Sequence, residues 1–293
     1  MLKKLESLIR LAYIVAIVLA VYVVFFMPAG TGTGPTTGPG GDTSQQEESN
    51  EFALYTFLNG IKSAKGTLSI DMDFKFDNGD KLDIESKQQF ESKGGDSGIT
   101  GTTAYKLNGD ALIMDDATYI QAGRRYSKTS SGYVVDDNIK LDGGNLNLSA
   151  IEKILGKNDT LVKEDNVACY KYTCIMSYGD MSNELRNFIR AQGINIADID
   201  NIDLDITIYV SEKNVPYKIK IEFEDAGCNV KCKSLASKSG TMKGEIVITF
   251  NSFNGVENIN FPAEIKNASE GEYMFVDKLA KYLSVIGSGD AID

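Results

Sequence analysis

The residues best suited to covalent chemistry are four cysteines, which fall into two close pairs, Cys169/Cys174 and Cys228/Cys232. Outside the cytoplasm, an even number of cysteines is typical of disulfides, and we expect one local bridge within each pair. Because Cys169 and Cys174 are five residues apart, they would face opposite sides of a regular strand, so their bridge requires a bulge. Crossed pairings, a zinc site formed by all four thiolates and free buried thiols are the alternatives.

No pattern in the sequence indicates catalysis. The chain contains no histidine, which removes the usual general base near neutral pH and the commonest zinc ligand. An acidic string, Asp198, Asp200, Asp203 and Asp205, lacks the glycine and the terminal glutamate of a calcium-binding EF-hand loop. A solvated strand face is the favoured interpretation of that string. We therefore predict a protein that is not an enzyme and has no cofactor, catalytic residue or metal site.

Net charge and glycosylation motifs indicate which partners and which location the protein can have. The formal net charge is −11, so phosphate backbones would repel the chain, and nucleic acid is excluded as a partner. Three Asn-x-Ser/Thr triplets, at Asn147, Asn158 and Asn267, are acceptors for glycosylation if they lie outside the cytoplasm. The sequence indicates no protein partner.

Residues 1–28 are predicted to form a cytoplasmic stub and a transmembrane helix. The apolar run from Leu8 to Met27 contains Arg10 as its only charge, and about 20 helical residues span the hydrocarbon core of a bilayer. Lys3 and Lys4 precede the run and Arg10 lies near its start, which predicts a single-pass cell-membrane protein with a cytoplasmic N-terminus. The domain that follows would then be extracytoplasmic. A cleaved signal peptide is the alternative, although the residues after the run form a poor cleavage site.

The rest of the chain divides into three parts. Residues 29–50 are rich in Gly, Thr and Pro and are predicted to be a flexible linker. Residues 51–270 are predicted to form the extracytoplasmic domain. Residues 271–293 are predicted to form an amphipathic helix and a tail.

Alternation of apolar and polar residues dominates the domain and predicts strands with one buried face. The segments 68–76, 82–90, 204–210, 217–223 and 246–250 all show it. Asn78-Gly79 suits a hairpin turn that needs positive φ. Several short strands are expected between 104 and 136, with turns near 108–109, 115–116, 123 and 131–132. Asp136-Asp137 is likewise interpreted as part of a turn.

Helices are expected over 51–63, 149–156, 182–192 and 272–286. Strands with one solvated face usually pair in antiparallel sheets. The apolar face of such a sheet must be covered by other elements of the chain. The predicted fold class is therefore α+β: after a single N-terminal transmembrane helix, a curved antiparallel β half-barrel with helices covering its concave face.

The order of these segments resembles a known family. An amphipathic helix is followed by TLSIDMDFKF, TYIQAGRRYSKTSSGYVVDD, VACYKYTCIMS, IDLDITIYVSEKNVPYKIKIEF and GEIVITFNSFNGVENINFPAEI. This arrangement, over residues 51–268, is similar to the LolA-like half-barrel superfamily, which includes the periplasmic lipoprotein carrier and lipid-binding lipoproteins. The extracytoplasmic domain, residues 51–270, is therefore predicted to be LolA-like. The chain departs from that pattern in lacking a lipidated cysteine, in its C-terminal helix and in an insertion from Asp225 to Lys243.

The resemblance implies that the domain binds a lipid or another hydrophobic ligand between sheet and helices. The apolar face expected to contact the ligand carries Ile70, Met72, Phe74, Leu82, Ile84, Ile206, Ile208, Ile219 and Ile221. The alternative is a non-catalytic structural or protein-interaction module of the cell surface, in which the protein's own side chains fill the same face.

Overall fold

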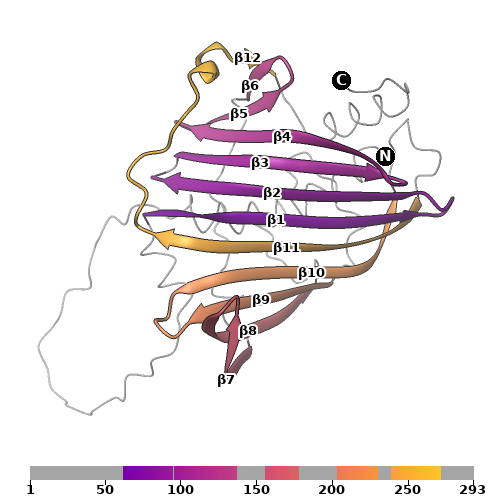
Figure 1. Ribbon diagram of the computed structural model, residues 1–293, viewed down its shortest axis with the longest axis vertical. Coiled ribbons are helices and arrows are strands. Elements are labelled where there is room, and N and C mark those ends of the chain that lie inside the picture. The colour runs from indigo at the N-terminus through magenta and orange to yellow at the C-terminus, as the bar shows by residue number, and fades with distance from the viewer. Residues whose placement is uncertain (1–61, 95, 137–155, 178–202, 230–238, 272–293) are drawn as a thin grey trace, which may run out of the picture.

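The computed structural model describes residues 62–94, 96–136, 156–177, 203–229 and 239–271, which form one twelve-stranded sheet (Figure 1). The strands are β1 (Ser63–Phe76), β2 (Lys81–Lys93), β3 (Asp96–Leu107), β4 (Asp110–Gln121), β5 (Arg124–Thr129), β6 (Gly132–Asp136), β7 (Gly156–Glu164), β8 (Val167–Ser177), β9 (Asp203–Ser211), β10 (Pro216–Asn229), β11 (Ser239–Phe253) and β12 (Ser269–Glu270).

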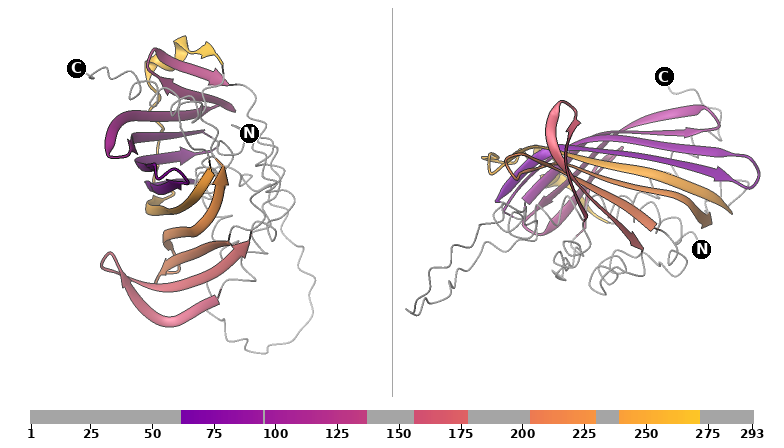
Figure 2. Two further views of the ribbon diagram at one scale, coloured as in Figure 1. Left: turned by 90° about the vertical axis from the view of Figure 1, so that its right-hand side faces the viewer. Right: turned by 90° about the horizontal axis from the view of Figure 1, so that it is seen from below.

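The strand order in the sheet is β12-β6-β5-β4-β3-β2-β1-β11-β10-β9-β8-β7. Neighbouring strands are antiparallel except β12, which runs parallel to β6. The long β1–β11 pairing joins the meander β1–β6 to the meander β7–β11. The sheet is twisted and curved (Figure 2). The predicted curved antiparallel sheet is therefore confirmed.

The predicted α+β class is wrong for the described part of the chain. Alternation with period two continues through these segments, so their backbone groups pair between strands, and the helical structure described is the 3₁₀ turn η2 (Ala263–Asn267). The helices expected over 51–63, 149–156, 182–192 and 272–286 fall almost entirely outside the described residues, as do the linker and residues 8–27. Where residues 51–63 are described, Ser63 already begins β1. Among the described residues, no helix is long and apolar enough to cross a bilayer.

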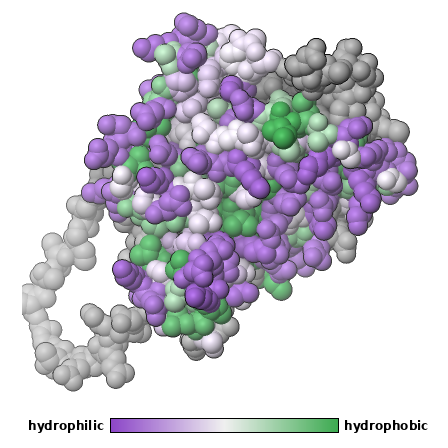
Figure 3. Space-filling view, viewed as in Figure 1, coloured by the Kyte–Doolittle hydropathy of each residue, from purple (hydrophilic) through white to green (hydrophobic). Residues whose placement is uncertain are grey.

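The two faces of the sheet differ in burial. In β1, the even-numbered residues Leu68, Ile70, Met72 and Phe74 are buried, whereas the odd-numbered residues between them are exposed or half-buried. We call the side that carries these even-numbered residues the inner face and the opposite side the outer face. Hydrophilic residues gather over the central strands in Figure 3, as expected for a solvated outer face.

The turns predicted between the first strands are confirmed in part. Gly79 (φ 90°), Gly109 (φ 100°) and Gly123 (φ 78°) occupy the left-handed region at hairpin turns, as predicted. The turn expected at 115–116 is wrong, because both residues continue β4. Asp136 likewise belongs to β6 rather than to a turn, and it pairs across the sheet with Arg125.

The insertion expected from Asp225 to Lys243 is shorter than predicted. β10 continues to Asn229 and β11 begins at Ser239, so Cys228 lies opposite Gly240 in the same ladder. The register shift between Phe223 and Ala226 is the bulge that accommodates this extension.

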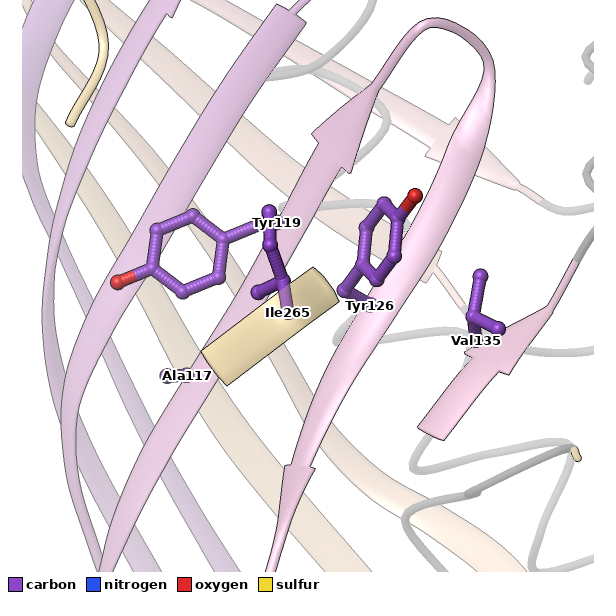
Figure 4. Packing of buried hydrophobic residues seen from close by; sticks show 5 residues of the cluster. All are labelled: Ala117, Tyr119, Tyr126, Val135 and Ile265. Atoms are coloured by element: carbon purple, nitrogen blue, oxygen red, sulfur yellow. The ribbon is translucent and has the colours of Figure 1, made fainter. Parts of the chain in front are cut away.

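After β11, residues 254–268 form a strap that runs along one end of the strands on the outer face (Figure 1). The Asn254 backbone N–H donates to the Ser63 carbonyl oxygen at 2.7 Å, and Lys93 on β2 donates to the Glu257 carbonyl oxygen. The strap ends in η2, where Ile265 packs near Tyr119 and Tyr126 on the outer side of β4 and β5 (Figure 4). This gives the sheet a second, small core on the outer face, formed by Ala117, Tyr119, Tyr126, Val135 and Ile265.

Candidate functional site

The inner face carries all nine residues predicted to contact a hydrophobic ligand. Each is buried, with at most 5% of its surface exposed. Ile70, Met72 and Phe74 lie on β1, and the others lie on β2, β9 and β10. The structure therefore brings together, on one continuous surface, residues that lie up to 151 positions apart in the sequence.

Strand register arranges the inner face in rows that run across the strands. In one row, Ile206, Ile221, Ile246 and Ile70 lie side by side on β9, β10, β11 and β1. The next row contains Ile208, Ile219, Ile248 and Leu68 on the same strands. Cross-strand neighbours at this spacing pack directly against each other. These two rows, from β9 to β1, are therefore formed by aliphatic side chains, and we call this part of the inner face the aliphatic half.

The same two rows become polar at the boundary between β1 and β2. The first row continues from Ile70 to Ser86 on β2 and Thr103 on β3. The second continues from Leu68 to Gln88, then Gly101 on β3 and Asp116 on β4. We call the four residues Ser86, Gln88, Thr103 and Asp116 the polar island.

The polar island is buried and internally hydrogen-bonded. None of its residues is more than 5% exposed. The hydroxyl oxygens of Ser86 and Thr103 are 2.9 Å apart, the Thr103 hydroxyl donates to Asp116 Oδ2 at 3.3 Å, and Gln88 Nε2 donates to the same oxygen at 3.4 Å. Burial of a carboxyl group is costly unless such donors surround it. The four residues therefore form a buried, hydrogen-bonded cluster on the inner face.

Gly101 makes the contact between Gln88 and Asp116 possible. These residues lie on β2 and β4, with β3 between them, and residue 101 is the position of β3 that lies in their row. Because glycine has no side chain, nothing stands between the Gln88 amide and the Asp116 carboxylate.

Next to the polar island, strands β5, β6 and β12 carry charged residues. Arg125 on β5 donates from its guanidinium to Asp136 Oδ2 at 2.6 Å. Register places this ion pair on the inner face, because Arg125 lies opposite Ile120 and Ile120 lies opposite Ser97. The adjacent Arg124 contacts Glu270 of β12 at 3.0 Å, so the two arginines have separate carboxylate partners.

The outer face carries a row of carboxylates across five strands. Asp71 on β1 lies between Glu85 and Glu245, Glu245 lies opposite Glu222, and Glu222 lies opposite Asp205. Partial burial raises the pKa of the Asp71 carboxyl, and the charges of Asp73 and Glu85 raise it further. Lysines bridge much of the row: Lys220 lies 2.6 Å from Glu245 and 2.9 Å from Glu222, and Lys106 contacts Glu85.

These acidic residues do not form a metal site. Within the described ranges, no group of three or more Cys, Asp or Glu side chains is arranged to hold a metal ion. Asp203 and Asp205 lie exposed on β9, which confirms the solvated strand face for that half of the acidic string. Asp198 and Asp200 are outside the described residues.

The predicted disulfide at Cys169 is wrong, because this thiol is free and buried. β8 pairs with β9 in an unbroken register from Cys169 to Ser177, so the bulge that a Cys169–Cys174 bridge requires is missing. Burial raises the pKa of the Cys169 thiol, and the carboxylate of Glu164 adds to this effect. The side chains of Cys174 and Cys228 and the whole of Cys232 lie outside what the structure describes.

Beside Cys169, Lys218 on β10 is buried and 8% exposed. Its ammonium lies 2.5 Å from Glu164 Oε1 and also contacts Asp165 at the β7–β8 turn. Burial lowers the pKa of Lys218, but hydrogen bonds to Asp165 and Glu164 outweigh that effect, so its pKa is raised. The cluster therefore fixes the β7–β8 hairpin to β10.

Of the three glycosylation triplets, Asn267 is described and is exposed at the end of η2. Asn158 lies in β7 but only its backbone is described, and Asn147 lies outside the described residues. Modification of these residues remains a prediction.

The polar island is the feature that the sequence interpretation missed. Its signal is present in β2, where the even positions change from Leu82 and Ile84 to Ser86 and Gln88. The apolar positions of β2 predict a buried face, but its polar positions led to no prediction of a site, and Asp116 was expected to lie in a turn. Only the pairing of β2, β3 and β4 shows that these residues meet.

No family model matches this chain, and no curated protein matches it. Solved structures do. The chain is similar to LprF from Mycobacterium bovis, with a TM-score of 0.34 and 14% identity, over 70% of this chain and 90% of that one.

Two further structures resemble it. A LolA superfamily protein from Nitrosomonas europaea has a TM-score of 0.21 and 10% identity, over 70% of this chain and 90% of that one. A β-barrel-like protein of a domain of unknown function from Brucella abortus has a TM-score of 0.18 and 7% identity, over 66% of this chain and 99% of that one. A LolA superfamily structure is among these neighbours.

Proposed function

We propose that the domain binds a lipid or another hydrophobic molecule against the aliphatic half of its inner face. The observation that supports this most directly is the pair of rows that place Ile, Leu and no polar residue on four adjacent strands. Ligand sites for apolar molecules are lined by such side chains, with a few polar groups that fix orientation.

The proposal is one of binding without catalysis, outside the cytoplasm at a cell membrane. The absence of histidine from the chain supports the first part. The second part is supported by the sequence, in which Lys3 and Lys4 precede a long apolar run and the residues after it are acidic overall. Protease added to intact cells should cleave the acidic domain, and protection in cells combined with cleavage in lysates would contradict this location.

Native mass spectrometry of the full chain, released from detergent, tests the binding function. We expect a mass increment that disappears on denaturation, and organic extraction of the same sample should yield the molecule responsible. A matched pair of variants locates the site. Ile246→Asn introduces an amide on the inner face, where Ile246 is 1% exposed, whereas Ile113→Asn makes the same change on the outer face, where Ile113 is 69% exposed.

Loss of the bound mass in Ile246→Asn alone, with both variants folded by circular dichroism, supports the inner face. Equal loss in both variants would place binding elsewhere. A wild-type chain that carries nothing and takes up no hydrophobic dye would overturn the proposal in favour of a structural or interaction module with a filled core.

A further inference from the structure

We propose that the end of the strap and the β5–β6 hairpin stabilise each other, so that they detach from β4 together as one cooperative unit while the remaining strands stay paired. This unit, which we call the hairpin unit, consists of β5, β6, η2 and β12, residues 124–136 and 263–270. The inference concerns a conformational change of the fold and does not depend on the binding of a ligand.

The hairpin unit is joined to the rest of the sheet by a short ladder. β5 pairs with β4 over four residue pairs, at positions 118–121 of β4. β3 pairs with the same strand over eleven, at positions 110–120. The two pairs between β12 and β6 lie within the hairpin unit and do not connect it to β4. Detachment of the unit therefore breaks fewer backbone hydrogen bonds than separation of β3 from β4.

The strap connects the hairpin to a strand with which it does not pair (Figure 1). At the start of the strap, the Asn254 N–H donates to the Ser63 carbonyl oxygen of β1 at 2.7 Å, and the Val256 N–H donates to the Ser63 hydroxyl at 3.1 Å. After β12, the Gly271 N–H donates to the Val135 carbonyl oxygen of β6 at 3.1 Å. The first part of the strap can thus stay on β1 as a tether when the hairpin unit detaches.

Side chains of the strap pack against both sides of the short ladder. Ile265 of η2 is 6% exposed and shares the small outer core with Tyr119 of β4, Tyr126 of β5 and Val135 of β6 (Figure 4). The Phe261 ring lies 5.9 Å from the Tyr119 ring. Loss of η2 would expose apolar surface on the hairpin, and loss of the hairpin would expose Ile265. Because neither part keeps its apolar side chains buried without the other, we expect them to open together.

Ion pairs do little to hold the hairpin unit on β4. Arg125 and Asp136 lie 2.6 Å apart on β5 and β6, so this pair moves with the hairpin and is not broken by detachment. Lys128 of β5 does reach across to Asp115 of β4, at 3.4 Å. Both of these side chains are exposed, and exposed pairs contribute little to stability. Packing around Ile265 is therefore the main attachment besides the short ladder.

Hydrogen exchange followed by mass spectrometry, with the full chain in detergent micelles, tests this inference. A two-stranded hairpin is marginally stable alone, so the amides of β5 and β6 should exchange whenever the unit detaches. In the wild type, we expect the β5 and β6 peptides to exchange at one common rate. That rate should be at least about tenfold faster than the rate of the β1 and β2 peptides, which belong to strands paired on both sides.

A matched pair of variants tests the role of the strap. Ile265→Ala should speed exchange in β5 and β6 by a further factor of about ten or more and leave β1 and β2 unchanged. Lys266→Ala is the control, because Lys266 is the next residue of η2 and is exposed, and it should leave all rates unchanged. Ile265→Val, which shortens the side chain by one carbon, should give a smaller rise in the same peptides and provides the result if Ile265→Ala does not fold.

Three results would overturn the inference. The first is exchange of β5 and β6 as slow as that of β1 and β2 in the wild type. The second is an equal rise in all strands of the Ile265 variants, which would show that the sheet opens only as a whole. The third is faster exchange in η2 and β12 of these variants while β5 and β6 stay protected, because the strap would then be bound to the hairpin without holding it.

Discussion

Gly101 of β3 lies against the backbone of Lys87 in β2 so closely that a Cβ atom at position 101 would be 2.1 Å from the Lys87 carbonyl oxygen. Such a distance cannot be relieved by a change of side-chain rotamer, because the obstructing atom belongs to a strand paired on both sides. The close approach of β2 and β3 at this point also brings Gln88 within reach of Asp116.

We expect Gly101→Ala to destabilise the fold by about 1–3 kcal/mol, since the strands must separate to admit the methyl group. Gly255→Ala is the control, because the nearest atom to a Cβ there lies at 3.5 Å and its backbone is not in the left-handed region. Urea unfolding followed by far-UV circular dichroism measures the difference. Equal effects at both sites would show that the strand contact is looser than described.

Shortening a side chain of the aliphatic half should lower the free energy of unfolding, and the loss should be larger for a more deeply buried side chain. Ile70 is 2% exposed, and we expect Ile70→Ala to lower the free energy of unfolding by about 2–5 kcal/mol. Ile175 on β8 is 68% exposed, and the same substitution there should change stability by no more than about 0.5 kcal/mol. A small effect of Ile70→Ala would contradict the buried state of the inner face.

Neutralising Asp71 should stabilise the protein near neutral pH. Its pKa is raised in the folded state, so its ionisation opposes folding, and the stability present below pH 3.8 is lost as the pH rises through the folded-state pKa. Since the side chain is only partly buried and solvent screens its charge, we expect Asp71→Asn to gain a few tenths of a kcal/mol at pH 7.

The gain from Asp71→Asn should shrink as the pH falls toward 3.8, where the wild-type carboxyl becomes protonated. Asp77→Asn, in the exposed turn after β1, serves as the control. Denaturant titrations at several pH values provide the measurement, and destabilisation by Asp71→Asn throughout would show that the neighbouring carboxylates do not repel it.

Cys169 should be unreactive in the folded chain. Its side chain is 0% exposed and burial raises its pKa, so both access and thiolate content are low. We expect iodoacetamide at pH 8 to leave the Cys169 peptide unmodified until the protein is denatured, after which it should react fully without reductant. A Cys169 peptide that reacts only after reduction would show that Cys169 forms a disulfide.

The tyrosine pair beside the strap should make the fold sensitive to alkali. Burial raises the pKa of Tyr133 from 10 to about 12, and the neighbouring Tyr119 adds to the effect. Because the folded state holds its proton more tightly than the unfolded state, the stabilisation is complete below pH 10 and is lost as the pH rises toward 12. Tyr133→Phe should therefore show a shallower loss of stability between pH 10 and 12 than wild type, and an identical slope would argue against burial of this hydroxyl.

The sequence by itself determined the strands and their buried sides. Alternation at Leu68, Ile70 and Met72 fixes which side chains share a face, because successive residues of a strand point to opposite sides. Hairpin turns at Gly79, Gly109 and Gly123 follow in the same way from local backbone preference. These are properties of neighbouring residues, and pattern reading identifies them without knowledge of the partner strands.

Features that depend on the register between distant segments were decided by the tertiary structure alone. The aliphatic rows and the polar island arise because Ile70 aligns with Ile246 on one side and Ser86 on the other, and neither alignment is written in the local pattern. The free thiol of Cys169 and the place of Asp116 within β4 were misassigned for the same reason. Local spacing gives the direction of a side chain, but only strand pairing determines which side chain it meets.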